Sequence, residues 1–230
     1  MYERIQRRAL LPESVSAADE ALFNGRPDIA RTAIIDAIHE NYTHDPRAYH
    51  HLALKTVALP LYELIYIRPT AERIKAAREN VYTHTVGLIE SELASPDSYS
   101  LSPEVRTRQT GRLSEDVVLG LHNSSDDSQG LLVPAKQLDD ISEKKDFVYF
   151  PPHQTKDPER YAQVKTRSSP LLPEGIILIN MLLLDPDFDG HELHDSLART
   201  MARDVSGEST WQDTERLGQA RKRLNELFKN

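Results

Sequence analysis

Two short segments in the second half of the chain have the pattern of β-strands. They are residues 146–150, Asp-Phe-Val-Tyr-Phe, and residues 161–165, Tyr-Ala-Gln-Val-Lys. The loop between them contains prolines at positions 151, 152 and 158, and proline cannot sit in the interior of a hydrogen-bonded ladder. The pattern therefore predicts two strands joined by an irregular loop.

Alternation along these strands indicates which side chains act together. In the second segment, Gln163 and Lys165 point to one face, and Ala162 and Val164 point to the other. Asp146 opens the first segment. An oxygen ligand beside an ammonium group, opposite a carboxylate, suits a divalent cation and a polarised water. Asp146, Gln163 and Lys165 are therefore candidates for a metal-dependent hydrolytic site.

Length and composition limit the class of protein. The chain has 230 residues, enough for one large domain or two small ones. It contains no cysteine, which excludes disulfides and thiolate metal sites. Residues 1–11 lack the apolar stretch of a secretory signal, and the longest apolar run, residues 176–184, is too short to span a bilayer. We therefore expect a cytoplasmic protein without a membrane segment.

The charge balance bears on the partners of the chain. The formal net charge is −8, with 28 basic and 36 acidic residues, whereas nucleic-acid binding is driven by clustered Lys and Arg. This balance argues against broad contact with nucleic acid and leaves room for a local basic groove. Two basic groups are candidates for such a groove: Arg106, Arg108 and Arg112, and then Arg221, Lys222 and Arg223. Solvated helix faces are the other interpretation of both groups.

The first hundred residues have the periodicity of α-helices. One helix is predicted to be capped by Ser14 or Ser16 and to end at a turn over residues 24–27. The second helix has an apolar stripe of Ile29, Ala33, Ile34, Ala37 and Ile38. A third helix begins at residues 45–46, with a kink or break at Pro60. Thr70 caps a fourth helix. We predict a helical module over residues 1–98, ending in a turn-rich segment.

Residues 99–230 are predicted to form a second domain, of the α+β class. Ser114 can cap a helix that carries Glu115. Residues 131–133 are a short apolar piece, residues 137–145 are polar, and residues 176–179 suit a buried strand or a helix. Amphipathic helices over 191–205 and 213–228 close the chain. Helices on both sides of short strands indicate a small mixed β-sheet flanked by helices.

The order of these residues resembles a known family. Gly111-Arg112-Leu113-Ser114-Glu115 on a helix, an Asp that opens a strand, and then Gln163-Val164-Lys165 are similar to the motifs of the PD-(D/E)XK nuclease superfamily. The closest similarity is to its variants with a Gly…Glu helix and a final Gln-x-Lys motif. The resemblance covers residues 111–184 and implies a restriction-endonuclease-like fold with Mg²⁺-dependent cleavage of DNA or RNA.

The resemblance also implies a role for each matching residue. Asp146 would be the main metal ligand, and Gln163 would be a second ligand through its side-chain oxygen. Lys165 would orient or deprotonate the attacking water and stabilise charge on the phosphate. Glu115 would be an auxiliary ligand from the helix. Mg²⁺ prefers oxygen ligands and keeps several waters, so one or two side chains suffice.

Two further motifs invite a metal interpretation. Asp185, Asp187 and Asp189 match the first half of a calcium loop, but Ser196 stands where that loop needs a bidentate Glu. A turn with a helix cap at its end is the favoured interpretation. His191 and His194 are three residues apart rather than the four of a zinc-binding helix, which favours an exposed helix start.

Two functional hypotheses follow, from different classes. The first is a Mg²⁺-dependent nuclease, or a nuclease-like protein that binds nucleic acid, centred on Asp146, Gln163 and Lys165. The second is a non-catalytic interaction or scaffold protein with a degenerate nuclease fold, whose helical module binds a protein partner. The ordered Glu…Asp…Gln-x-Lys series favours the first, and the excess of acidic residues favours the second.

Overall fold

The structure is a computed structural model that describes residues 13–41, 46–67, 69–94, 103–124, 130–151, 160–166, 174–181 and 215–228. These residues form seven helices and a four-stranded sheet, so the protein is of the mixed α+β class. The chain divides into two compact units. The first is drawn from Met1–Val81, Gln129–Gln163 and Pro173–Ile176, and the second from Tyr82–Ser128, Val164–Leu172 and Ile177–Asn230.

The first unit begins with two helices joined at the predicted turn. Helix α2 (Glu13–Phe23) is followed by α3 (Pro27–Asn41). Gly25 has a φ of 67°, a left-handed conformation that glycine adopts without steric cost, and Pro27 occupies the first helical position, where its missing N–H is not needed. The predicted caps are wrong, because Ser14 and Ser16 both lie inside α2.

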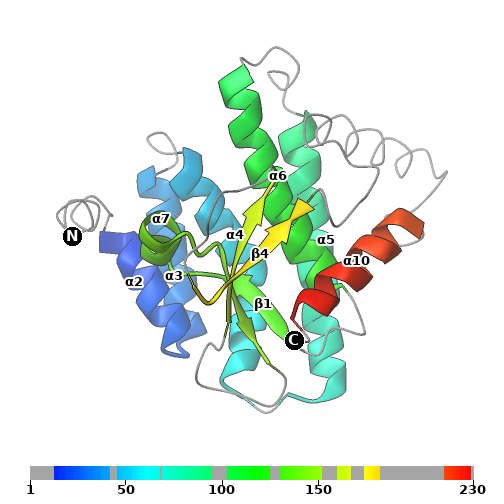
Figure 1. Ribbon diagram of the computed structural model, residues 1–230. Helices are drawn as coiled ribbons and strands as arrows, with labels where there is room; N and C mark the ends of the chain where they lie inside the picture. The colour runs from blue at the N-terminus through cyan, green and yellow to red at the C-terminus, as the bar shows by residue number, and fades with distance from the viewer. Residues whose placement is uncertain are drawn as a thin grey trace. The chain divides into compact units, whose positions relative to one another are not determined.

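The buried face of α3 differs from the predicted stripe at two positions, Ile29 and Ala30. Ala30, Ile34 and Ala37 are fully buried, whereas Ile29 is 47% exposed. The three buried residues are spaced so that they lie on one side of the helix. Helix α3 packs against α2 and against α4 (Pro46–Ile65), and Figure 1 shows these helices side by side. The predicted stripe therefore included an exposed isoleucine.

The next two helices follow the sequence pattern closely. Helix α4 continues through Pro60 without ending, so of the predicted kink or break the break is wrong and the kink stays a prediction. Helix α5 (Ala71–Ala94) begins after Thr70, whose Oγ1 accepts a hydrogen bond from the Arg73 N–H at 3.3 Å. This contact confirms the predicted N-cap.

The sheet has the strand order β1-β2-β3-β4. Its strands are β1 (Leu131–Pro134), β2 (Phe147–Phe150), β3 (Arg160–Lys165) and β4 (Ile176–Asn180). Strand β2 pairs antiparallel with β1, where Val133 faces Val148, and with β3, where Phe147 faces Ala162. The predicted strand pair and the strand at residues 176–179 are thereby confirmed. Helix α4 packs on β1, and every residue of β2 is buried.

A short helix that the sequence pattern did not predict precedes β2. Helix α7 (Gln137–Glu143) lies in the stretch that the sequence analysis described only as polar. It ends at Lys144, whose φ of 59° is left-handed and whose N–H donates to the Asp140 carbonyl at 3.2 Å. This is the αL type of helix C-cap. It directs the chain through Lys145 to Asp146 and into β2.

The second unit contains α6 (Pro103–Asn123) and α10 (Glu215–Leu227), which pack against each other. The His122 ring meets the Phe228 ring edge-on at 5.3 Å. The predicted cap at Ser114 is wrong: the residue lies in the middle of α6, and its hydroxyl donates to the Thr110 carbonyl at 2.7 Å. Helix α10 confirms the predicted C-terminal helix.

Several predictions fall on residues outside the described ranges. They include the predicted helix over 191–205, the calcium-loop motif over 185–190 and the His191–His194 pair. The predicted domain boundary at residues 98–99 also lies there and stays a prediction. The first compact unit does take helices α2–α4 from one side of that boundary and strands β1–β2 from the other.

Candidate functional site

Asp146 is held between two strands by its backbone. Its N–H donates to the Ala162 carbonyl at 2.9 Å, and its carbonyl accepts from the Ala135 N–H at 3.0 Å. In a regular antiparallel strand, both groups of one residue bond to the same neighbouring strand. The chain therefore departs from regular strand geometry at Asp146, one residue before β2, and the residue itself is only 8% exposed.

Gln163 lies on β3 and is one of several buried residues with a side-chain atom that has no hydrogen-bond partner among the described residues. The residue is 4% exposed, and its Oε1 atom has no hydrogen-bond partner among the described residues. A buried polar atom without a partner costs roughly 1–3 kcal/mol. Such an atom calls for an explanation, and a bound ion or water is among the usual ones. The structure thus leaves an amide oxygen available at the position predicted to bind a metal.

Lys165 and Glu115 complete the predicted set. Lys165 is half-buried at the end of β3, two residues after Gln163, so strand alternation places the two side chains on one face. Glu115 is half-buried on α6, between the buried residues Ser114 and Asp116. Asp146 and Gln163 belong to the first compact unit, whereas Glu115 and Lys165 belong to the second. The Asp146 N–H binds the Ala162 carbonyl of β3, so Asp146 lies beside the part of β3 that contains Gln163.

The donor set at this strand pair is poor in carboxylates. Within the described ranges, no three His, Asp or Glu side chains form a group that could hold a metal ion. The predicted ligands are two carboxylates and one amide oxygen. A magnesium ion, which keeps most of its waters, suits such a set better than an ion that needs a full cage of protein ligands.

Lys145, which precedes Asp146, is bound to the neighbouring elements. Its Nζ lies 2.6 Å from Glu143 Oε2 and 3.9 Å from the centre of the Tyr161 ring. Burial lowers the pKa of Lys145, but the hydrogen bond and charge of Glu143 outweigh burial, so the pKa stands above its ordinary value. These contacts link the end of α7 to β3 just before Asp146.

A buried polar cluster, which we name the junction cluster, holds the connection between β1 and α7. It consists of the side chains of Asp19, His51, Lys55 and Tyr62. Lys55 is completely buried, and its ammonium contacts Asp19 Oδ1. Asp19 Oδ2 accepts the N–H of Gln137, the first residue of α7, at 2.8 Å. The N-cap residue of α7, Lys136, makes no side-chain hydrogen bond to the first turn of the helix. Asp19 of α2 supplies the hydrogen-bond acceptor in its place.

The other two members bind the backbone just before α7. His51 Nε2 lies 3.1 Å from the Ala135 carbonyl, and since a carbonyl only accepts, Nε2 carries the proton. His51 Nδ1 lies 3.8 Å from Asp140 Oδ2. The Tyr62 hydroxyl donates to the Pro134 carbonyl. His51, Lys55 and Tyr62 have the i, i+4, i+11 spacing of one helix face, so α4 turns a polar face to the junction.

Burial perturbs the titration of this cluster. It lowers the pKa of Lys55 to about 7, while the charges of Asp140 and Asp139 act in the opposite direction. The Asp19 carboxylate in contact with Lys55 also favours the charged ammonium. Burial raises the pKa of Tyr62 well above its ordinary value. Tyr62 therefore remains a donor at neutral pH, whereas Lys55 changes charge near it.

The sequence analysis missed the junction cluster. The only local signal was a lysine four residues after a histidine inside an otherwise apolar helix, where Leu52, Leu54 and Ala58 are buried. Such a lysine usually extends to solvent. Its partner Asp19 lies 36 residues away in the sequence, and no pattern within one helix pairs residues at that distance.

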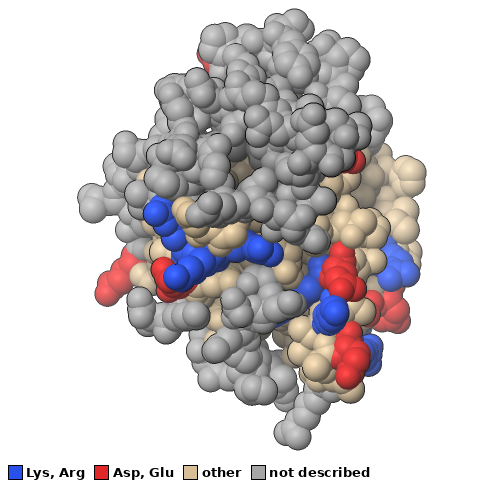
Figure 2. Space-filling model, turned by 90° about the vertical axis from the view of Figure 1, so that its right-hand side faces the viewer, with Lys and Arg blue, Asp and Glu red and all other residues tan. Residues whose placement is uncertain are grey.

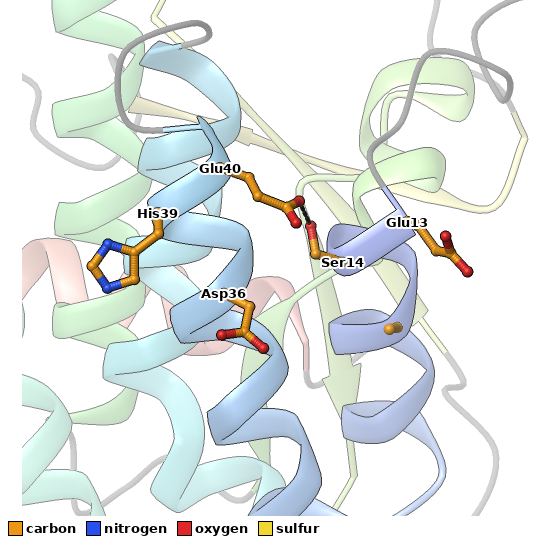
Figure 3. A pocket seen from close by; sticks show the side chains of 6 residues that line it. Glu13, Ser14, Asp36, His39 and Glu40 are labelled. Carbon is orange, nitrogen blue, oxygen red and sulfur yellow. Dashed lines mark hydrogen bonds between the residues drawn. The ribbon is translucent and has the colours of Figure 1, made fainter.

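Helices α2 and α3 also enclose an open acidic hollow. It is lined by Glu13, Ser14, Ala17, Asp36, His39 and Glu40. Figure 3 shows Ser14 and Glu40 pointing toward each other, joined by the hydrogen bond from the serine hydroxyl, and His39 pointing to the other side of α3. The hollow presents carboxylates to solvent.

Comparison with known proteins assigns the chain to no family. No family model, curated protein or solved structure matches the chain. The resemblance to PD-(D/E)XK nucleases therefore stays a prediction carried by the motif residues. Among the described helices, none is long and apolar enough to cross a membrane.

Proposed function

We propose that the protein is a Mg²⁺-dependent nuclease, or a nuclease-like protein that binds nucleic acid, with its site at the β2–β3 strand pair. The observation that carries this proposal is the buried Gln163 Oε1, which has no hydrogen-bond partner among the described residues. Its position next to Asp146 across two antiparallel strands, and two residues before Lys165, matches the order of groups that the motif requires.

Each residue would contribute a distinct group. Asp146 and Gln163 would supply the oxygen ligands, with Glu115 as an auxiliary carboxylate from α6. Lys165 would orient or deprotonate the attacking water and stabilise negative charge on the phosphate. A bound Mg²⁺ would polarise that water and neutralise phosphate charge. The four-stranded sheet with flanking helices supports a restriction-endonuclease-like arrangement for the domain.

The surface charge sets the kind of binding to expect. In the described part of the face shown in Figure 2, basic side chains form one row with acidic side chains at its end, and a second region mixes both signs. A surface of mixed sign gives weak long-range attraction for nucleic acid. We therefore expect cleavage to depend on close contacts at the site, with a modest dependence of binding on salt.

Cleavage assays test the proposal directly. Single- and double-stranded DNA and RNA are incubated with the full chain and Mg²⁺ or Mn²⁺, alongside Asp146→Ala and Lys165→Ala. We expect metal-dependent cleavage in wild type and a loss of about 100-fold or more in both variants. Lys75→Ala, at an exposed position of α5, is the control and should keep full activity. Cleavage that survives both substitutions, or is absent with every metal and substrate, overturns the proposal.

A second candidate function is a non-catalytic interaction protein. It is favoured by two large apolar side chains on the surface of α3, where Ile29 and Ile35 are 47% and 50% exposed. In this case the helices would bind a protein partner and the sheet would be a scaffold. Binding of a partner that is lost in Ile35→Ser, in a protein that cleaves nothing, would support this function over the first.

A further inference from the structure

Helix α7 is too short to hold its own position. It has seven residues, and isolated helices shorter than about 12 residues are marginal in water. Its placement must therefore come from contacts with the rest of the first unit. Asp19 binds its first N–H at Gln137, and His51 approaches Asp140 one turn later. The contacts that fix α7 therefore come from the junction cluster.

The same helix determines where the chain enters β2. The Lys144 N–H donates to the Asp140 carbonyl, and Lys145 is tied to Glu143. Asp146 follows directly. The start of β2 is therefore connected to the junction cluster through this short helix and through Ala135, whose N–H donates to the Asp146 carbonyl. A movement of α7 would move the backbone on the N-terminal side of Asp146.

We infer that Asp19, His51 and Lys55 form a protonation-sensitive latch that holds α7, and through it the segment leading to Asp146, in place. The latch itself stands on the contacts within the first unit. Its consequence for the site at Asp146 rests on the proposed function, for which it would provide regulation by pH.

The charges around Lys55 determine the direction of the pH effect. Asp19 faces it from α2, Asp139 and Asp140 from α7, Lys136 from the junction, and His51 from its own helix face. Burial lowers the pKa of Lys55 to about 7 from an ordinary value of 10.5. Between these values, a state with α7 released and Lys55 in water binds the proton more strongly. The state with α7 docked is therefore stabilised relative to the released state as pH rises above about 7, and it is least stable below pH 7.

Amide hydrogen exchange of the full chain tests the latch without using activity. Protection factors of residues 137–147 are measured at about pH 6 and pH 9 in wild type, Lys55→Met and Lys75→Met. We expect wild type to gain about tenfold or more in protection at the higher pH, and Lys55→Met to show no such gain. Lys75 lies in an exposed ion pair with Glu79, so Lys75→Met should behave as wild type. The same pH dependence in wild type and Lys55→Met overturns the inference.

A second measurement keeps the test decisive if Lys55→Met does not fold. An NMR titration of the Lys55 side-chain nitrogen in wild type should have its midpoint near pH 7, as its burial requires. A midpoint near the ordinary 10.5 overturns the inference.

The Asp146→Ala variant distinguishes a failure of the latch from a failure of the proposed function. This variant should keep the pH-dependent protection of α7 and lose cleavage. Absence of cleavage in wild type, with pH-dependent protection intact, removes the proposed function and leaves the latch.

Discussion

The junction cluster and the β2–β3 strand pair both bury polar side chains, but they satisfy them differently. At the junction, the Lys55 ammonium, the Asp19 carboxylate and the Tyr62 hydroxyl all meet partners within the protein. At the strand pair, the Gln163 amide oxygen has none among the described residues. An unmade hydrogen bond in the interior costs more than a made one contributes. The paired groups of the junction cluster therefore hold the structure, and the unpartnered Gln163 oxygen is the group that the proposed function assigns to a metal ion.

Breaking the junction should give the largest change in stability. Lys55→Met removes the nitrogen that donates to Asp19 and leaves the Asp19 carboxylate buried without a partner on α4, and removing one partner of such a buried pair costs about 3–5 kcal/mol. Urea unfolding measures the loss. Lys75→Met is the control, and removing its exposed pair with Glu79 should change the free energy of unfolding by less than about 1 kcal/mol.

The double variant Asp19→Asn/Lys55→Met sharpens this comparison. It removes both charges together and should be more stable than Lys55→Met alone, because no carboxylate is left buried without an opposite charge. A double variant that loses the full sum of the two single losses would show that the pair is not coupled.

A pH series gives the next largest effect. The folded-state pKa of Lys55 is lowered to about 7 from 10.5, so the unfolded chain binds more protons between these values and stability rises with pH. The difference in unfolding free energy between wild type and Lys55→Met should grow by up to about 1.4 kcal/mol per pH unit above pH 7. Equilibrium unfolding at several values up to about pH 9, below the range where tyrosines titrate, measures it. A difference independent of pH would mean that Lys55 stays charged.

The smallest effect is expected at the end of α7. Lys144 adopts the left-handed conformation at a φ of 59°, which costs a residue with a Cβ roughly 1 kcal/mol. Lys144→Gly should raise the free energy of unfolding by about 0.5–1 kcal/mol. Lys136 has an ordinary negative φ of −62°. Lys136→Gly is therefore the control and should not raise the free energy of unfolding. Destabilisation by Lys144→Gly would contradict the assigned backbone conformation.

The strand pair was predictable because its signals are local. Alternation of apolar and polar residues in β3, with prolines in the loop before it, predicted the strands, and the common face of Gln163 and Lys165 stays a prediction. The N-cap at Thr70 was predictable for the same reason. In these cases the residues that determine the structure are adjacent in the sequence.

The elements that sequence reasoning missed depend on distant partners. Helix α7 has no apolar stripe, and its first N–H is bound by Asp19, which lies 118 residues away. Ser114 had the sequence context of a cap, but α6 extends upstream of it, where packing buries Gln109 and Thr110, and the serine hydroxyl bonds back to the preceding turn. Tertiary contacts determined these structures against the local signal.

The most direct test of the account is the effect of Mg²⁺ on wild type and Gln163→Leu. We expect saturating Mg²⁺ to raise the free energy of unfolding of wild type, by about 2.7 kcal/mol at one hundred times the dissociation constant, and to leave that of Gln163→Leu unchanged. Without metal, Gln163→Leu should be the more stable protein by about 1 kcal/mol or more, because it removes the buried amide oxygen. Equal stabilisation of both proteins by Mg²⁺, or none of wild type, would contradict the claim that the Gln163 oxygen is a metal ligand.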